Sequence, residues 1–395
     1  MTHPHTCFCC SGEQKHKNLH IIIKLRMTRK ELTKQEALDI VTGAKILACG
    51  GGGSEKKAID NVNKTYDNGK NFTIVDLSDL KDDDNICIIG MVGGGITDED
   101  RKFIENREII DTEPMVTAVK ELESFLNIEF RGFVATELGP NNSIIPMMVA
   151  AEMDKVAING DCCGRSKPKI SISTTRVTDI AIAPFSIVSQ YGDIQLVKKT
   201  VDDVRGELLA RTASRLSGGS VSVARCPMTV KKGKEAIIPD TYNLALTVGK
   251  NIRKAKEEGS NTIEILHKSI SGSRLIFEGI LTSFSRIEQG GFTSGEIVME
   301  TVGGKKLKVW YQNEYLLSWL DKNQFITCPD GLYIVDSKTG YGLSPWEEDF
   351  QKGREVAVFA RDAPVIWRSE KGLTIFGPEV FAENWGTYKS IDELI

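Results

Sequence analysis

Short apolar segments alternate with longer amphipathic segments between residues 71 and 159, and this alternation constrains the fold more than any other feature of the sequence. The short segments are rich in Val, Ile and Phe and predict strands, whereas the longer ones have the apolar spacing of helices. Strands separated by helices pair in parallel, because a parallel connection needs about a dozen residues or more. We expect strands at 71–76, 86–90, 131–136 and 155–159, with helices at 114–126 and 143–153.

The pattern changes character after about residue 200. Helices are expected at 32–47, where Thr33 can cap the N-terminus, from Ser54 to about residue 62, and at 201–216 and 241–257. Short alternating strands with turn residues between them then follow, at 275–284, 295–301, 305–312, 315–320, 332–335 and 355–360. The sequence therefore predicts an α/β N-terminal domain with a mostly parallel sheet over 32–200, and a β-rich, mostly antiparallel C-terminal domain with some helix over 201–395.

The composition excludes several classes of protein. The 395 residues include 50 Lys and Arg against 54 Asp and Glu, and a formal net charge of −4 leaves no basic footprint for nucleic acid. No apolar run reaches the roughly 18 residues that a membrane-spanning helix needs. Nine scattered cysteines without a secretory signal are typical of reduced thiols. We expect a cytoplasmic protein whose partner is a small molecule, not a nucleic acid or a membrane.

Residues 1–31 look unlike the rest of the chain and are expected to form a disordered leader. Its Cys7-x-x-Cys10 and His16-x-x-x-His20 spacings leave adventitious metal binding open, although the two pairs lie too close together for a zinc finger. The chain has five histidines, and His267 is the one outside the first twenty residues. This count excludes from the body a three-histidine zinc site and a catalytic triad built on any other histidine. His267 itself is expected at the surface.

Two glycine clusters are candidate ligand contacts. Gly50, Gly51, Gly52 and Gly53 precede a helix, where exposed main-chain N–H groups can approach an anion; a flexible turn between helices is the alternative. The cluster is neither a Walker A loop nor a dinucleotide fingerprint, because no Gly-Lys-Ser/Thr follows and the third glycine is replaced by Glu55. Residues 90–95 (GMVGGG) end a buried strand, where they either contact a ligand or pack on a neighbouring strand.

Polar residues follow the two expected strands at 131–136 and 155–159. Because parallel strands end at the same edge of a sheet, their following loops should lie side by side. Two of these residues are carboxylates, Glu137 and Asp161. Either can act as a general base if burial raises its pKa, although ordinary loop and cap roles remain open. A Cys162 nucleophile would need a base that the sequence does not place nearby. The residues so brought together are Glu137, Asn141 and Asn142 from the first loop, and Asp161, Cys162, Cys163 and Arg165 from the second.

A third polar cluster, Gln312-Asn313-Glu314, interrupts two apolar strand segments in the C-terminal half. Asn313 tolerates a left-handed backbone, so the three residues can form a turn. They can equally line a cleft between the two domains. The pattern favours neither alternative.

The ordered motifs of the chain resemble those of the S-methyl thiohydantoin desulfurase-like family, once catalogued as a domain of unknown function beside hydantoinases. The resemblance runs from about Leu32 to Phe381. In 159–168 (NGDCCGRSKP) the second Asp, the Gly-Arg and the Pro of an Asp-x-Asp-Gly-x-Gly-Arg-Ala-x-Pro pattern are kept, whereas Asn159 and Cys162 replace an Asp and a Gly. The other matching segments are Gly50–Gly53, an acidic-Leu-Gly loop at Glu137, and residues 277–279, 291–295, 312–314, 329–330 and 377–378.

The resemblance implies a hydrolase that acts on a small cyclic amide of the hydantoin type. Water would attack the ring carbon that bears a thioether, with Glu137 or Asp161 as base, while Arg165 and the amides of Gly50–Gly53 hold ring oxygens or a side-chain carboxylate of the substrate. Asn141, Asn142, Asn313 and Glu314 would complete the ligand site, and a divalent metal held by carboxylates and water remains open. The alternative is a non-catalytic ligand-binding or partner subunit of a hydantoinase-type complex. The expected assembly is a homo-oligomer or an association with hydantoinase-type proteins.

Overall fold

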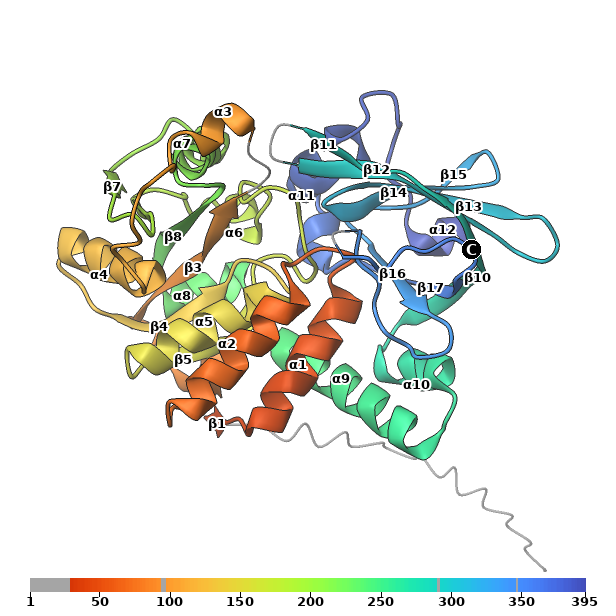
Figure 1. The fold of residues 1–395 in the computed structure, drawn as a ribbon, viewed down its shortest axis with the longest axis horizontal. Helices are drawn as coiled ribbons and strands as arrows, with labels where there is room; N and C mark the ends of the chain where they lie inside the picture. The colour runs from red at the N-terminus through yellow and green to blue at the C-terminus, as the bar shows by residue number, and fades with distance from the viewer. Residues whose placement is uncertain (1–28, 94–96, 290–291, 346) are drawn as a thin grey trace, which may run out of the picture.

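The computed structural model describes residues 29–93, 97–289, 292–345 and 347–395. The expected leader, apart from its last three residues, and residues 94–95 of the second glycine cluster lie outside these ranges. The described chain forms two sheets that lie side by side, with helices packed in front of the first sheet and below both (Figure 1). None of the helices in these ranges is long and apolar enough to cross a membrane.

The first sheet has a parallel centre, as the sequence predicts. Its central strands, β2, β5, β4 and β3, run in parallel. Strands β4 and β5 are buried almost throughout, which is why their sequences are continuous apolar segments. Antiparallel strands extend the sheet on both sides. In spatial order the strands are β1 (Lys30–Glu31), β2 (Thr73–Val75), β5 (Val156–Asp161), β4 (Phe130–Ala135), β3 (Asn85–Gly93), β8 (Ser220–Thr229), β6 (Phe185–Val188) and β7 (Ile194–Val197), with β9 (Ile238–Pro239) paired to β5.

Strand β8 is the main feature of this sheet that the sequence pattern did not indicate. It comes after residue 200, in the half expected to form the second sheet, yet it pairs antiparallel with β3 from Asn85↔Thr229 to Gly93↔Ser220. Several helices that follow residue 200 also pack on the first sheet or its helices. They are α7 (Asp203–Leu216), α8 (Val230–Ala236) and α9 (Thr241–Glu258).

The helices in front of the first sheet begin where the sequence places their caps. Thr33 caps α1 in a capping box with Glu36, and Ser54 caps α2. Helix α1 crosses α9 at close range because glycines meet there: a Cβ atom on Gly43 would lie 1.8 Å from the carbonyl oxygen of Ala245. The helices are α1 (Lys34–Leu47), α2 (Glu55–Asp67), α4 (Pro114–Leu126) and α5 (Pro140–Glu152).

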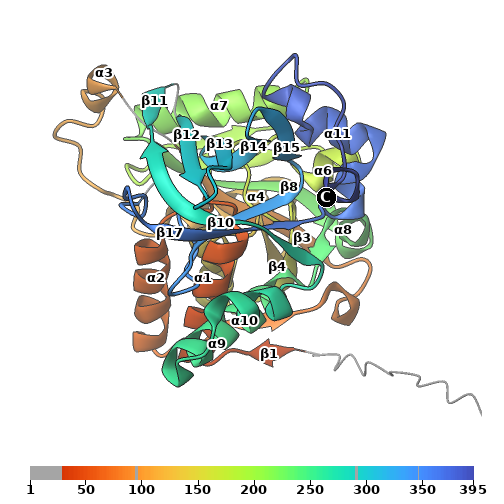
Figure 2. The same cartoon turned by 90° about the vertical axis from the view of Figure 1, so that its right-hand side faces the viewer.

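The second sheet is antiparallel throughout and curls into a half-barrel, which confirms the expected β-rich C-terminal half. Alternate residues of β12 are buried, as in a strand with one face on the core. Figure 2 shows these strands curving across the molecule with α9 and α10 below them. Their order is β15 (Asn323–Thr327), β14 (Glu314–Leu320), β13 (Lys306–Gln312), β12 (Phe292–Glu300), β10 (Ser273–Phe284), β17 (Glu355–Arg361) and β16 (Gly331–Asp336), with β11 (Ile287–Gln289) beside β12.

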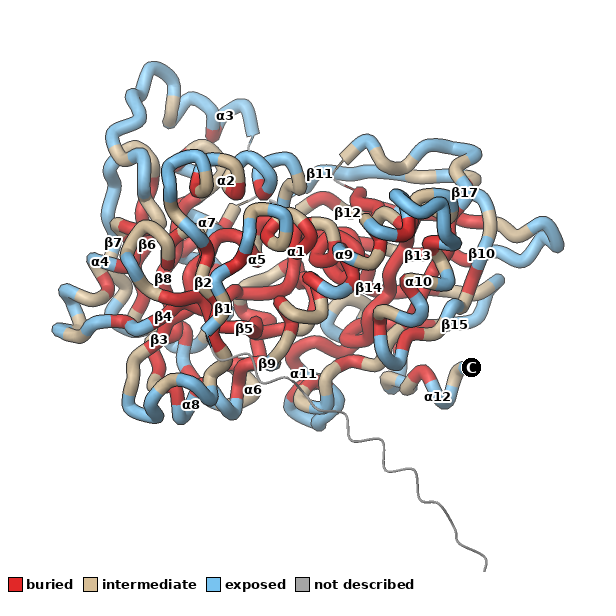
Figure 3. The backbone as a smooth tube through the Cα atoms, turned by 90° about the horizontal axis from the view of Figure 1, so that it is seen from below, coloured by how far each residue is buried: buried red, intermediate tan, exposed pale blue. Residues whose placement is uncertain are grey.

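The two sheets share one continuous core. Phe133 of β4, Tyr242 of α9 and Tyr311 of β13 belong to a single cluster of buried apolar side chains, and buried backbone runs through the junction in Figure 3. The junction is therefore packed like a protein interior. The remaining short elements are α3 (Asp98–Arg101), α6 (Thr174–Val177), α10 (Thr262–Ser269), α11 (Glu370–Phe376), α12 (Ile391–Leu394) and 3₁₀ turns at Leu77–Asp79, Val365–Arg368 and Pro378–Val380.

Candidate functional site

The loops that follow β4 and β5 lie side by side at the carboxyl edge of the first sheet, as expected for parallel neighbours. The Ser166 hydroxyl donates to the carbonyl oxygen of Leu138 at 2.7 Å, and the main-chain N–H of Lys167 donates to Glu137 Oε2 at 3.2 Å. The two loops are thus joined by direct hydrogen bonds. Glu137, which the sequence analysis selected, stands at their centre.

Glu137 is a buried carboxylate with fixed partners. Asn142 Nδ2 donates to its Oε1 at 2.6 Å, and Lys167 Nζ lies 3.5 Å from its Oε2. The Lys167 ammonium also donates to the carbonyl oxygen and the hydroxyl of Thr136. Burial raises the pKa of Glu137, while the charge of Lys167 and the hydrogen bond from Asn142 act in the opposite direction. These contacts orient the carboxylate and favour its ionised form.

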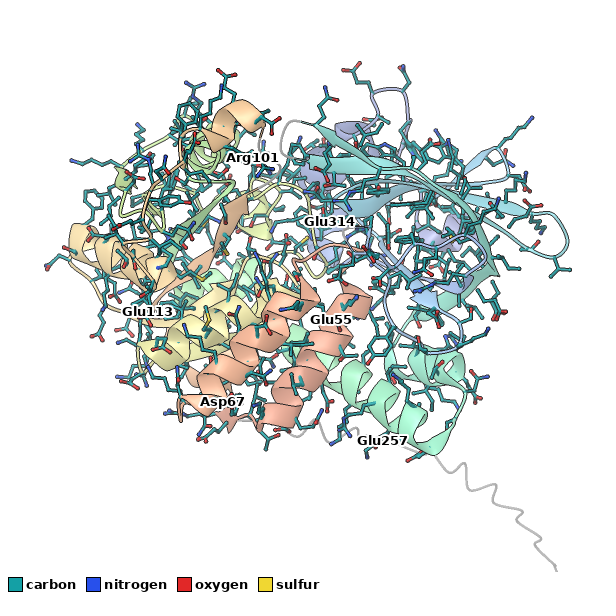
Figure 4. The ribbon with its side chains drawn as sticks, in the orientation of Figure 1. Glu55, Asp67, Arg101, Glu113, Glu257 and Glu314 are labelled. Atoms are coloured by element: carbon teal, nitrogen blue, oxygen red, sulfur yellow. The ribbon has the colours of Figure 1, made fainter. Side chains whose placement is uncertain are left out.

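Glu314 approaches the same place from the second sheet, as the first residue of β14 (Figure 4). Asn313, with φ 63°, makes the tight left-handed link from β13, and its side-chain oxygen accepts from the N–H of Thr293 at 2.9 Å. The Glu314 side chain is 3 % exposed, and its Oε2 atom is buried with no hydrogen-bond partner in the described structure. Asn313 is therefore a turn residue, whereas Glu314 turns inward to the junction.

The two carboxyl groups influence each other's protonation. Burial raises the pKa of Glu314 well above its usual value, and the nearby charge of Glu137 raises it further. Glu137 has an ion pair with Lys167 and a hydrogen bond from Asn142, whereas Glu314 Oε2 has no hydrogen-bond partner among the described residues. The pKa of Glu314 is therefore raised further than that of Glu137, so Glu314 keeps its proton to the higher pH and Glu137 ionises first. Two carboxyls with such different environments are suited to act as an acid and a base.

The turn at Gly50–Gly53 packs against both sides of this pair. A Cβ atom on Gly51 would lie 2.0 Å from Glu314 Oε1, and one on Gly52 would lie 2.3 Å from the Cα of Gly139. The carbonyl oxygen of Gly52 accepts from the N–H groups of Asn141 and Asn142. Glycine is required here because φ at Gly52 is +82° and because the chain segments touch. The turn thus sets where Glu314 and Asn142 can lie.

Asp161 and Arg165 hydrogen-bond to main-chain atoms of the loops around Glu137. The charge of Lys167 acts on Asp161 as it does on Glu137, and the charge of Arg165 acts on Glu314. Asp161 Oδ1 accepts from the N–H groups of Cys163 and Gly164, both at 2.6 Å, while its Oδ2, like Glu314 Oε2, is buried with no hydrogen-bond partner in the described structure. The Arg165 guanidinium donates to the carbonyl oxygens of Ser166, Tyr315 and Asp330. Within the described structure no hydrogen bond or ion pair joins Asp161 or Arg165 to Glu137 or Glu314. Arg165 fastens the loop after β5 to the second sheet.

Neither the two cysteines that follow Asp161 nor His267 supplies a reactive group at the carboxyl edge of the first sheet. Burial raises the pKa of Cys162 to about 12, so its thiol stays protonated at neutral pH. Cys163 is equally buried, and burial raises its pKa well above the usual range. His267 is exposed on α10, as the sequence predicts. Among the described residues, no group of three or more His, Cys, Asp and Glu side chains is spaced to hold a metal ion.

Sequence reasoning missed three polar residues of the site: Lys167, Thr136 and Arg225. Arg225 Nη2 donates to Thr136 Oγ1 at 2.7 Å, and the same oxygen accepts from Lys167. Thr136 directly precedes Glu137, and Lys167 lies two residues after Arg165. The rule that the two loops lie side by side could therefore have predicted both residues. Arg225 belongs to β8, whose return to the first sheet had no signal in the pattern.

Asn159, at which the family pattern has Asp, lies in β5 but caps the N-terminus of α9, which is distant in sequence. Its Oδ1 accepts from the N–H groups of Tyr242 and Asn243 in the first turn of α9, and its Nδ2 donates to Asp76 and Asp240. An amide can donate to these carboxylates and accept from the helix at the same time. The departure at Asn159 therefore has a local structural reason.

Comparison with known proteins identifies the family. The models of the N-terminal and C-terminal domains of the S-Me-THD-like family match residues 35–199 and 201–390. No curated protein matches the chain. An X-ray structure of a protein from Chromobacterium violaceum is similar over 92% of this chain and 100% of its own, with a TM-score of 0.75 at 20% identity, which shows a likeness of fold. The chain belongs to the S-Me-THD-like family, the S-methyl thiohydantoin desulfurase-like family that its motifs resemble.

Proposed function

We propose that this protein is a hydrolase that acts on a small cyclic amide of the hydantoin or thiohydantoin class and releases a thiol. The observation that carries the proposal is the buried pair of Glu137 and Glu314. One carboxyl is held by a lysine and an amide, and the other has an oxygen with no hydrogen-bond partner in the described part of the chain. Membership of the S-Me-THD-like family supports the choice of ring.

The proposed reaction begins with attack of water on the ring carbon that bears the thioether. Glu137 takes one proton from the water as the C–O bond forms, and the ring nitrogen of the breaking C=N double bond takes the proton of Glu314. The tetrahedral intermediate then loses its sulfur: the C–S bond breaks and Glu137 returns its proton to the departing thiolate. The hydroxyl proton restores Glu314, which leaves a ring carbonyl and a free thiol.

The other polar residues have supporting roles in this proposal. Lys167 and Asn142 orient Glu137 and favour its ionised form, and Thr136 holds the Lys167 ammonium. Asp161 and Arg165 are positioning residues, because their hydrogen bonds go to main-chain atoms of the loops that carry the pair. The Gly50–Gly53 turn adjoins the pair, and its main-chain N–H groups, apart from that of Gly51, which donates to the carbonyl oxygen of Ala48, would contact ring oxygens of the substrate.

The test is thiol release from an S-methylated thiohydantoin by the purified full chain, followed with a thiol reagent. We expect Glu137→Gln and Glu314→Gln each to lower kcat by about a hundredfold or more, since each removes one proton-transfer group. Asp330→Asn is the matched control, because Asp330 is also a buried carboxyl but hydrogen-bonds to Tyr388 and the N–H of Ala363 instead. Equal loss in all three variants would contradict the assigned roles.

The competing function is a non-catalytic ligand-binding or partner subunit of a hydantoinase-type complex. It predicts that the pure chain binds the thiohydantoin without releasing thiol, and that turnover appears on adding a hydantoinase-type protein. Calorimetry of the ring compound on the wild-type chain, run beside the turnover assay, separates the two functions.

A further inference from the structure

A cavity of about 310 Å³ lies between α2, α4 and α5, apart from the carboxylate pair. Its apolar wall includes three methionines, Met91, Met115 and Met148, together with Val116 and Val149. Methionine side chains are flexible and polarisable, and they adapt to ligands of irregular shape. The volume is at the lower end of the range for small-molecule sites, which indicates a compact ligand.

The rim of this cavity has an uneven distribution of charge. Lys57 and Lys64 lie seven residues apart on α2, hence on one face, and neither forms an ion pair with any residue that the structure describes. Two rim carboxylates are already paired, Asp60 with Lys56 and Glu152 with Lys70. Glu113 is the remaining acidic residue on the rim. The unpaired charge of the rim is therefore net positive.

One amide on the rim completes the polar side. Asn61 lies between Lys57 and Lys64 on α2, and its Nδ2 donates to Asn141 Oδ1 at 3.1 Å. Asn141 also lines the cavity and donates its main-chain N–H to the carbonyl oxygen of Gly52. The cavity thus adjoins the glycine turn but takes no atom from Glu137 or Glu314 among its lining residues.

We propose that this cavity is a second binding site, for a small monocarboxylate with a branched or linear apolar body. The apolar body would lie against Met91, Met115 and Met148, and the carboxylate would lie at the rim between the ammonium groups of Lys57 and Lys64. A neutral ligand of the same shape would make the apolar contacts and lose the charged ones. Because the lysines are solvent-exposed, the charged part of the affinity weakens with added salt.

The test uses the full chain labelled with ¹³C in its methionine methyl groups, titrated with 4-methylpentanoate and, separately, with the neutral 4-methylpentanamide. The three cavity signals are assigned by Met91→Leu, Met115→Leu and Met148→Leu. We expect 4-methylpentanoate to shift these signals. The double change Lys57→Met and Lys64→Met should weaken its binding about fivefold at low salt, because two exposed charge contacts are lost. Binding of the amide should stay unchanged in that variant.

Two matched variants separate the site from other effects. Lys305→Met removes an exposed lysine between β12 and β13 that does not line the cavity, so it should leave binding unchanged. Glu314→Gln should also leave it unchanged, whatever it does to turnover, since Glu314 does not line the cavity. The proposal is overturned if neither probe shifts the three signals. It is equally overturned if Lys305→Met weakens binding as much as the double change, or if the amide binds as tightly as the carboxylate.

Discussion

The carboxyl group of Glu314 packs directly on the main chain of Gly51, so closely that a Cβ atom there would lie 2.0 Å from Glu314 Oε1. The two residues come from different halves of the protein, β14 and the turn between α1 and α2. The contact holds a carboxyl in a place where one of its oxygens has no hydrogen-bond partner among the residues that the structure describes. A buried polar group of this kind costs stability, and such costs are found mainly where a site needs them.

Replacing Glu314 by Gln is expected to stabilise the protein at neutral pH. The pKa of Glu314 is raised in the folded state, so unfolding at pH 7 lets this carboxyl ionise in water. The destabilising effect is absent below the unfolded pKa, near 4.5, and grows as the pH rises toward the folded pKa. Urea unfolding of both proteins from pH 4 to pH 8 should show the two stabilities diverging as pH increases.

The control for this measurement is Glu379→Gln, which changes an exposed carboxyl and should alter neither the stability nor its pH dependence. A wild-type stability that rises relative to Glu314→Gln between pH 5 and pH 8 would mean that Glu314 is ionised and well partnered in the folded protein. The acid role assigned to it would then fail.

Alanine at Gly51 and alanine at Gly52 should have different effects. A Cβ atom on Gly51 meets the end of the Glu314 side chain, which can move aside, so Gly51→Ala should lower turnover more than stability. A Cβ atom on Gly52 meets main-chain atoms of Gly139 at a φ of +82°, so Gly52→Ala should lower the free energy of unfolding by about 2 kcal/mol or more. Thermal unfolding and thiol release are measured on both.

A double-mutant cycle tests the contact itself. In a Glu314→Ala background, Gly51→Ala should cost nothing further in stability, because the opposing carboxyl is gone. If the Gly51→Ala cost persists there unchanged, the carboxyl of Glu314 does not limit the space at Gly51.

Arg165→Lys should act on stability. The guanidinium is buried, and three main-chain carbonyl oxygens accept from it, those of Ser166, Tyr315 and Asp330. A lysine cannot reproduce this fork, so we expect the free energy of unfolding to fall by roughly 2–3 kcal/mol. The kcat of the folded variant, measured at low temperature, should fall far less than in Glu137→Gln. Unchanged stability with a hundredfold lower kcat would instead assign Arg165 to the chemistry.

Asn159→Asp restores the residue of the family pattern and should destabilise this protein. The new carboxylate would face Asp76 and Asp240, which now accept from the Asn159 amide. Their mutual repulsion raises the folded pKa of the new group, so the loss should be fully present at pH 7 and shrink as the pH falls below about 4. Chemical unfolding at pH 7 and at a pH below about 4 measures this loss of stability. A loss of the same size at both would attribute the effect to the missing donor alone.

Local patterns were sufficient for the elements that border the site. The apolar spacing of α4, the caps of α1 and α2 and the strands β4 and β5 all follow from neighbouring residues, because hydrogen-bonding and amphipathic preferences act over one or two turns. The convergence of the Glu137 loop with the loop after β5 also followed, since it needs only the rule that parallel strands end together.

Contacts between distant segments were beyond these rules. Whether Gln312-Asn313-Glu314 forms a turn or faces the junction stayed open, and in the structure Asn313 forms the turn while Glu314 faces inward. Arg225 belongs to β8, a strand from the second half of the chain that pairs with β3 in the first sheet. Strand pairing across more than a hundred residues depends on the shared core and has no signature within either strand.

The sequence by itself determined an α/β half followed by an antiparallel half, the family, and Glu137 at the edge where two loops meet. The tertiary structure decided which groups surround Glu137: Lys167 and Asn142 from its own half, and Glu314 from the other. The physical reason is that burial and charge act through space. A carboxyl becomes an acid or a base according to the partners that folding places within a few ångströms of it, and chain order does not specify those partners.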